Sequence, residues 1–125
     1  MARVTHFEVH AEQPERAMVF YGRVFGWRFE RFGEYDYWTV RTGDPGEPGI
    51  DGGLVRRRGA IDGRSVIAFV CTVDVPDVDA AIRNVEEAGG RPVVAKFAVA
   101  GTGWLAYAKD PEGNIFGMMQ ADKNA

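Results

Sequence analysis

Apolar and polar residues alternate along residues 4–10, the first part of the chain with a clear period. Successive side chains of a strand point to opposite faces, so this period of two predicts a strand with one apolar and one polar face. The polar face carries His6, Glu8 and His10. Residues four apart on a strand are about 13 Å apart, so the two histidines cannot bind the same metal ion, whereas Glu8 and either histidine can converge on one ligand.

Two later stretches have the period of an amphipathic helix. In residues 14–25 apolar side chains recur at spacings of three and four, Pro14 suits a first helical turn, and Gly26 ends the pattern. A second stripe of this kind covers residues 77–88 and ends at Gly89. The first stripe is expected to pack in the core, and it consists of Ala17, Met18, Phe20, Tyr21, Val24 and Phe25. Alternating or apolar segments predict strands near residues 4–10, 27–32, 35–41, 54–58, 66–74, 91–99, 103–109 and 114–120.

The order of these elements in the first half of the chain recurs in the second half. A shift of 64 residues places Met18 on Ile82 and aligns the two helical patterns. The chain therefore contains two strand-helix-strand-strand-strand units, about residues 1–58 and 65–121, which we expect to form a single domain. Each unit has a helix on one face of its sheet, so a short chain buries both sheets only if the units pair. The predicted fold class is α+β, with two paired βαβββ modules forming a curved mixed sheet around a cavity.

The polar face of the first strand is the candidate binding surface. Phe7 and Val9 are expected to face the helix, which leaves His6, Glu8 and His10 pointing into the cavity. Aromatic residues of neighbouring strands are candidate ligand contacts, and alternation directs about half of them to the cavity: Tyr37, Trp38, Trp104 and Tyr107. Polar groups that converge on a partly enclosed apolar cavity are the usual form of a small-molecule site.

Composition and charge exclude several classes of function. The chain has 15 basic and 18 acidic residues, and its net charge of −3 gives no electrostatic reason to expect nucleic acid. The basic run Arg56, Arg57 and Arg58 is too short to follow a phosphate backbone. No apolar run reaches the length of a membrane span, and residues 1–6 lack the apolar core of a secretion signal, so we expect a cytoplasmic protein without membrane contact. Cys71 is the one cysteine, and its apolar neighbours predict a buried thiol.

Four segments, in order, carry a resemblance to a known family, and together they span nearly the whole chain: HFEVHAEQPERAMVFYGRVFGWRFE, IDGGLVRR, VDVPDVDAAIRNVEEAGG and GWLAYAKDPEGNIFGMMQ. The pattern FYxxVFGW followed by AGG and DPEGN is fairly specific in this order and spacing. The chain resembles the vicinal oxygen chelate superfamily, which includes glyoxalase I, extradiol dioxygenases and the bleomycin and fosfomycin resistance proteins. It is most similar to the small glyoxalase-like proteins of bacteria. The resemblance implies paired βαβββ modules around a cavity, in a homodimer.

Enzymes of this superfamily hold a divalent metal ion through side chains of the first, fourth, fifth and eighth strands. His6 matches the first-strand ligand. The predicted fourth strand, 54–58, has no acid or histidine, residues 66–73 have neither histidine nor glutamate, and Gly117 stands where glyoxalase I has a carboxylate. Metal activation needs two or three protein ligands. We therefore expect no cofactor, and a small-molecule binding protein of the glyoxalase and bleomycin-resistance type.

Two other functions stay open. The chain can be a lyase, isomerase or dioxygenase-like enzyme of the same superfamily that acts on a small metabolite. Glu8 is then the candidate general base, or a divalent metal ion binds in a rearranged site around His6 and Glu8. Alternatively, the chain is a structural or regulatory dimeric module whose cavity has no ligand.

Overall fold

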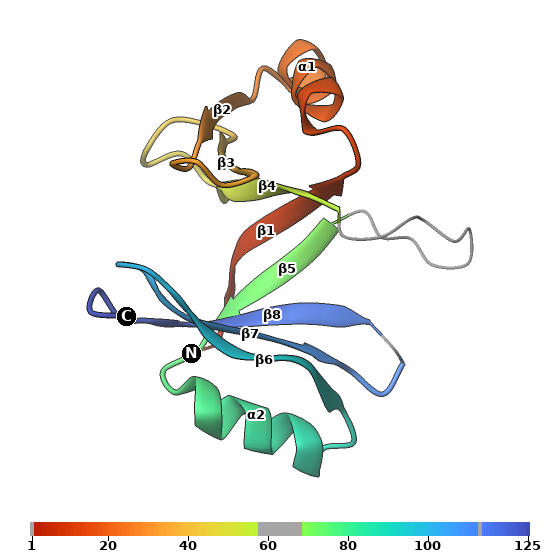
Figure 1. Cartoon of the computed structure of the whole chain (residues 1–125), viewed down its shortest axis with the longest axis vertical. Helices are drawn as coiled ribbons and strands as arrows, with labels where there is room; N and C mark the ends of the chain where they lie inside the picture. Colours follow the sequence, from red (N-terminus) through yellow and green to blue (C-terminus); the bar gives the residue numbers. More distant parts are fainter. Residues whose placement is uncertain (1, 58–68, 113) are drawn as a thin grey trace. The chain divides into compact units, whose positions relative to one another are not determined.

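The computed structural model describes residues 2–57, 69–112 and 114–125, drawn in colour in Figure 1. Within these ranges the chain forms two helices and eight strands, in the order β1 (Val4–Ala11), α1 (Pro14–Phe25), β2 (Arg28–Arg31), β3 (Tyr37–Arg41), β4 (Gly52–Arg56), β5 (Phe69–Asp74), α2 (Val78–Glu87), β6 (Arg91–Val99), β7 (Gly103–Lys109) and β8 (Ile115–Ala121). The predicted elements are all present, with boundaries shifted by at most about two residues where both ends are described. Residues 58 and 66–68, predicted as strand, lie outside the described residues.

The chain divides into two compact units, and each is described by itself. The N-terminal unit is His6–Val70, and the C-terminal unit is Met1–Thr5 with Cys71–Ala125. The strand order is β2-β3-β4-β1 in the first unit and β5-β8-β7-β6 in the second. In both, the first strand pairs in parallel with the last and the other pairs are antiparallel, so each unit is a βαβββ module with a mixed sheet. The predicted α+β class is confirmed.

The strand registers confirm the internal repeat. Glu8 of β1 lies beside Gly53 of β4, and Thr72 of β5 lies beside Gly117 of β8. Both members of the first pair are 64 residues before their counterparts in the second, the shift that also aligns the helix patterns. Each unit therefore places a buried polar side chain next to a glycine at the same position of its sheet.

The core of the N-terminal unit lies between its sheet and α1. It consists of Phe7, Val9, Ala11, Trp38, Val40 and Leu54. Ala17, Met18 and Tyr21 of α1 pack against this cluster. The prediction that Phe7 and Val9 face the helix is confirmed.

The remaining apolar residues of the α1 stripe do not enter this core. Phe20, Val24 and Phe25 are 55%, 54% and 59% exposed, so their predicted burial is wrong. At 100° per residue, Phe20 and Val24 lie to one side of the helix face that contacts the sheet, and Phe25 is the last residue of the helix. The helix presents these side chains on its surface.

Strand β4 begins two residues earlier than predicted, at Gly52. The two glycines at its start permit close packing. A Cβ atom on Gly52 would lie 2.6 Å from the backbone oxygen of Phe7, and one on Gly53 would overlap the hydroxyl of Tyr37. Glycine inside a strand often marks such a close approach.

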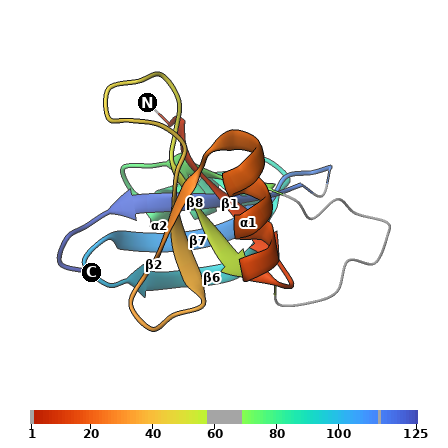
Figure 2. The same ribbon diagram turned by 90° about the horizontal axis from the view of Figure 1, so that it is seen from above.

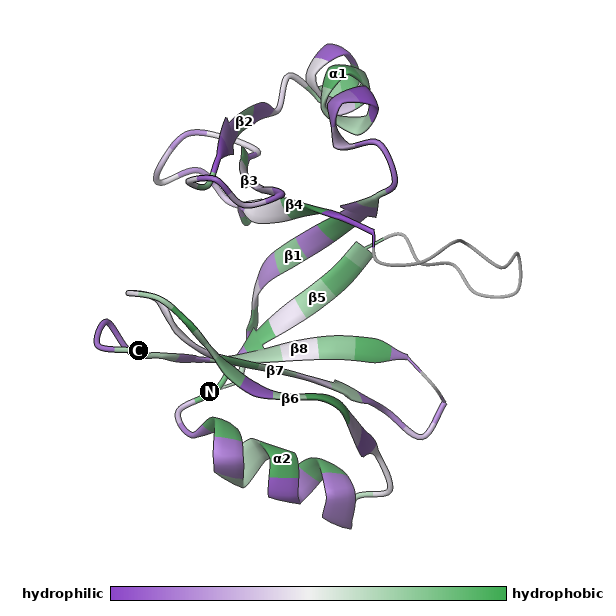
Figure 3. Cartoon of the chain, in the orientation of Figure 1, coloured by the Kyte–Doolittle hydropathy of each residue, from purple (hydrophilic) through white to green (hydrophobic). Residues whose placement is uncertain are grey.

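In the C-terminal unit, α2 covers one side of β6, β7 and β8, which lie side by side in Figures 1 and 2. Asp77 caps this helix by accepting a hydrogen bond from the backbone nitrogen of Ala80 at 3.1 Å. Figure 3 shows the apolar side of α2 facing the sheet. The core there contains Val78, Ala106, Ala108 and Met118. Cys71 of β5 is exposed, so its predicted burial is wrong. It is exposed because α2 packs mainly against the other three strands of the unit and not against β5.

Among the described residues, neither helix has the length and hydropathy needed to cross a membrane.

Candidate functional site

The face of β1 that points away from α1 carries three polar side chains in the N-terminal unit. Glu8 is 7% exposed, and His6 and His10 are half-buried. Because Gly53 has no side chain, the ring of Tyr37 from β3 extends over it toward this face. We call His6, Glu8, His10 and Tyr37 the polar cluster.

The polar cluster contains two close pairs of side chains, His6 with Tyr37 and Glu8 with His10. His6 Nε2 and the Tyr37 hydroxyl oxygen are 3.2 Å apart and share a hydrogen bond. His10 Nε2 lies 3.5 Å from Glu8 Oε1, which is longer than an ordinary hydrogen bond. His10 Nε2 is buried and makes no hydrogen bond within the described part of the chain. The structure thus brings three predicted site residues and one predicted aromatic contact together.

Burial and the charge of Glu8 shift the pKa values of His6 and Tyr37. Burial lowers the pKa of His6 below its usual value, although the negative charges of Glu8 and Asp51 act in the opposite direction. Burial raises the pKa of Tyr37 to about 12, and the charge of Glu8 adds to the effect. At neutral pH His6 is therefore a neutral imidazole and Tyr37 keeps its proton. The cluster offers a ligand both neutral hydrogen-bonding groups and a buried carboxyl group.

Asp51 and Arg57 border the polar cluster and were missed from the sequence. Asp51 directly precedes β4, and its Oδ1 accepts hydrogen bonds from the backbone nitrogen and hydroxyl of Thr42 at 2.9 and 3.3 Å. Arg57 donates from Nη2 to the backbone oxygen of His10 at 3.1 Å. The parallel pairing of β1 with β4 places both beside β1, and the late predicted start of β4 hid this relation for Asp51.

Two predicted ligand contacts lie in helix-facing cores instead. Trp38 is 7% exposed and belongs to the apolar core under α1, on the sheet face opposite Glu8. Trp104 packs against the core under α2, and its Nε1 donates to Asp122 Oδ2 at 3.0 Å. Residues that pair across strands share a face, and Trp38 pairs with buried Leu54. Trp104 shares its face of β7 with Ala106 and Ala108, which belong to the core under α2.

Tyr107 points to the other face of the C-terminal sheet. It pairs with Gly117, and a Cβ atom on Gly117 would lie 3.3 Å from Tyr107 Cε1 and from the hydroxyl oxygen of Thr72. Each unit thus has a tyrosine ring over a strand glycine beside a buried polar residue.

The residues present do not fit the metal site of the superfamily. Tyr107 and Thr72 crowd the position of the missing carboxylate at Gly117. In the ranges that the structure describes, no three histidine, cysteine, aspartate or glutamate side chains are grouped closely enough to hold an ion. His6 and Glu8 alone provide too few ligands for a divalent metal.

Comparison with solved structures shows the fold. The chain is similar to a methylmalonyl-CoA epimerase from Mycobacterium tuberculosis, with 16% identity, a TM-score of 0.62, and coverage of 95% of this chain and 87% of the other. It is also similar to a glyoxalase/bleomycin resistance protein/dioxygenase superfamily member from Vibrio splendidus, with 15% identity, a TM-score of 0.65, and coverage of 96% and 99%. A hypothetical protein from Bacillus halodurans has 11% identity, a TM-score of 0.66, and coverage of 99% and 97%.

A search of curated proteins finds no match. The family model described as glyoxalase-like domain matches residues 6–119, from the first histidine of the polar cluster to the last strand. The match includes the polar face of β1, the glycines of β4 and the tyrosine-glycine pair of β7 and β8. The resemblance to the vicinal oxygen chelate superfamily is confirmed, and the chain belongs to the glyoxalase-like domain family.

Proposed function

We propose that the protein binds a small molecule through the polar cluster without using a divalent metal ion. The burial of Glu8 carries this proposal. A carboxyl group that is 7% exposed costs stability unless its environment compensates for the lost water. Ionisable groups in such surroundings concentrate at functional sites. Here Glu8 lies between two half-buried histidines on a sheet face that is not used for the helix-facing core.

The chemistry of the cluster specifies what the ligand must offer. Glu8, when ionised, accepts hydrogen bonds, so the ligand presents a hydroxyl, amine or amide donor. Tyr37 keeps its proton at neutral pH and can donate to a ligand carbonyl or hydroxyl. A polar metabolite or antibiotic with both kinds of group meets these requirements. Tyr107 stays a predicted contact, whereas Trp38 and Trp104 are left out because they pack under the helices.

Thermal-shift screening of a metabolite and antibiotic panel tests the proposal. A ligand that binds the native state raises the melting temperature by mass action. We expect Glu8→Gln to abolish the shift caused by a compound that stabilises the wild-type protein. The matched control is Glu30→Gln, the same substitution at an exposed position of β2, which should keep the shift. A shift that survives Glu8→Gln unchanged would contradict binding through the polar cluster.

An isomerase that works by proton transfer is the second candidate function. The 3.5 Å separation of His10 Nε2 and Glu8 Oε1 favours it, because an adjacent carboxyl and imidazole can remove a proton and return it. Similar structures include methylmalonyl-CoA epimerase in complex with methylmalonyl-CoA, with 13% identity and a TM-score of 0.66. The test is incubation with methylmalonyl-CoA in D₂O. Deuterium uptake that Glu8→Gln abolishes would support the enzyme, and no uptake would leave the binding function.

We also propose a cytoplasmic homodimer, on the resemblance to the superfamily. Light scattering that shows a monomer at high protein concentration would contradict the dimer.

A further inference from the structure

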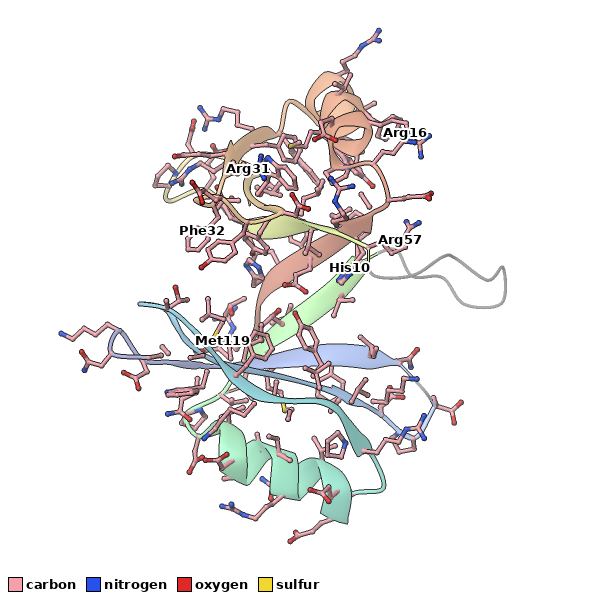
Figure 4. The ribbon with its side chains drawn as sticks, viewed as in Figure 1. His10, Arg16, Arg31, Phe32, Arg57 and Met119 are labelled. Atoms are coloured by element: carbon pink, nitrogen blue, oxygen red, sulfur yellow. The ribbon has the colours of Figure 1, made fainter. Side chains whose placement is uncertain are left out.

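A hollow in the N-terminal unit lies where β1 ends and α1 begins. Its volume is about 460 Å³, within the range of small-molecule sites. Figure 4 labels three of its lining residues, His10, Arg16 and Arg57, on β1, on α1 and just after β4. We call this hollow the end-of-β1 pocket. It shares His10 with the polar cluster, and its other lining residues come from the end of β1, from α1, from Arg57 and from Phe69.

Two arginines give the end-of-β1 pocket an excess of positive charge. Within the described ranges, neither Arg16 nor Arg57 has a carboxylate within ion-pair distance, whereas Arg31 and Arg56 of the same unit both pair with Asp36. The hydrogen bond from Arg57 Nη2 to the backbone of β1 holds the guanidinium group at the pocket, and its Nε is buried without a hydrogen-bond partner among the described residues.

One acidic residue also lines the end-of-β1 pocket. Glu12 is exposed at the rim, where its backbone oxygen accepts a hydrogen bond from Arg56. Its single carboxylate leaves the two arginines in excess. A guanidinium group without a carboxylate partner among the described residues can pair with an anion in the pocket.

One wall of the pocket is aromatic. Phe20 and Phe69 line it while remaining 55% and 47% exposed. Tyr21 lies between them, with its ring edge-on to Phe69 at 6.1 Å and edge-on to Phe20 at 5.2 Å. Exposed rings next to unpaired arginines are suited to a ligand with a charged end and a flat apolar body.

We propose that the end-of-β1 pocket binds an organic monoanion with a flat apolar body. Its carboxylate or sulfonate group contacts Arg57 and Arg16, and its rings cover Phe20 and Phe69. Inorganic phosphate would neutralise the arginines but leave the aromatic wall exposed to water. This site shares His10 with the polar cluster, but its proposed ligand is a different one and does not depend on the function proposed for that cluster.

Titration with 2-naphthoate, followed by NMR chemical shifts, tests this site. The neutral analogue 2-naphthalenemethanol and inorganic phosphate are the comparison ligands. We expect 2-naphthoate to bind at least about tenfold more tightly than either comparison ligand. It alone has both a negative charge for the arginines and an apolar ring system for the aromatic side chains. Equal affinity for the neutral analogue would overturn the proposal, because the arginines would then contribute nothing.

Variants locate the bound anion. Arg57→Gln should weaken 2-naphthoate binding about tenfold, whereas Arg23→Gln, at an exposed arginine later in α1, should leave it unchanged. If Arg57→Gln does not fold by circular dichroism, Arg16→Gln replaces it. Equal affinities of the Arg57 (or Arg16) and Arg23 variants would overturn the site. Loss of 2-naphthoate binding in Tyr37→Phe would also overturn it, since the anion would then accept a hydrogen bond in the polar cluster, whose own function would remain.

Discussion

Gly53→Ala should destabilise the protein through a clash with Tyr37. A Cβ atom at this position would overlap the Tyr37 hydroxyl and approach its Cε2 to 2.8 Å, so the ring must move away. Overpacking of this kind costs about 1–3 kcal/mol, and loss of the hydrogen bond with His6 adds about 0.5–1.5 kcal/mol. Replacing glycine by alanine inside a strand returns about 0.5–1 kcal/mol. The net expectation is a loss of about 2 kcal/mol in the free energy of unfolding.

Urea denaturation of four proteins measures this effect: wild type, Gly53→Ala, Tyr37→Ala and the double variant. In the Tyr37→Ala background the clash is absent, so Gly53→Ala should be neutral or slightly stabilising. The difference between the two backgrounds is the coupling between these positions, about 2 kcal/mol or more. Gly117→Ala is the matched control in the C-terminal unit, where contacts of 3.3 Å require only a small shift and a smaller loss. Equal costs of Gly53→Ala in both backgrounds would refute the placement of the Tyr37 ring over Gly53.

Two further predictions concern titration. In a spectrophotometric titration one of the four tyrosines should ionise near pH 12 and Tyr37→Phe should remove that step; a profile unchanged by the variant would contradict the burial of Tyr37. Because its folded pKa is raised, the stability linked to Tyr37 is present below about pH 10 and is lost as the pH rises toward 12. The pKa of His6 is shifted in the opposite direction, because it is lowered in the folded state. The unfolded state therefore takes up the proton first, and the free energy of unfolding falls as the pH drops below about 6.5. Urea denaturation at pH 7.5 and 5.5 should show a smaller fall for His6→Asn than for wild type, and equal falls would argue against burial of the imidazole.

Local patterns were sufficient to predict most of the fold. The alternation in β1 and the helical spacing in α1 and α2 each reflect contacts along one element, so their positions follow from the sequence. The start of β4 did not follow, because Gly52 and Gly53 are there to accommodate Phe7 and Tyr37, which are distant in sequence. The exposure of Phe20 could not be predicted either, because it depends on how far the sheet extends under α1, and the local apolar pattern does not contain that information.

The candidate site was predicted only in part. Alternation correctly assigned Glu8 to the face opposite Phe7 and Val9. It could not decide between Tyr37 and Trp38, because neighbouring residues of one strand always take opposite faces and only the pairing with β4 selects the buried one. In the sequence Arg57 is only one member of a short basic run, and its contact with the backbone of β1 can be recognised only once the parallel pairing is known.

Elemental analysis of the dialysed protein, combined with ligand binding after chelator treatment, tests metal-independent binding most directly. The chain provides His6 and Glu8 but has Gly117 where the resemblance implies a carboxylate ligand, and the described residues contain no group of three metal-ligating side chains. We predict far less than one transition-metal ion per chain, and the same metal content in wild type and His6→Ala. The affinity for a panel compound should be unchanged after chelator treatment. About one metal ion per chain that is lost in His6→Ala, with ligand binding lost on chelation, would contradict the account.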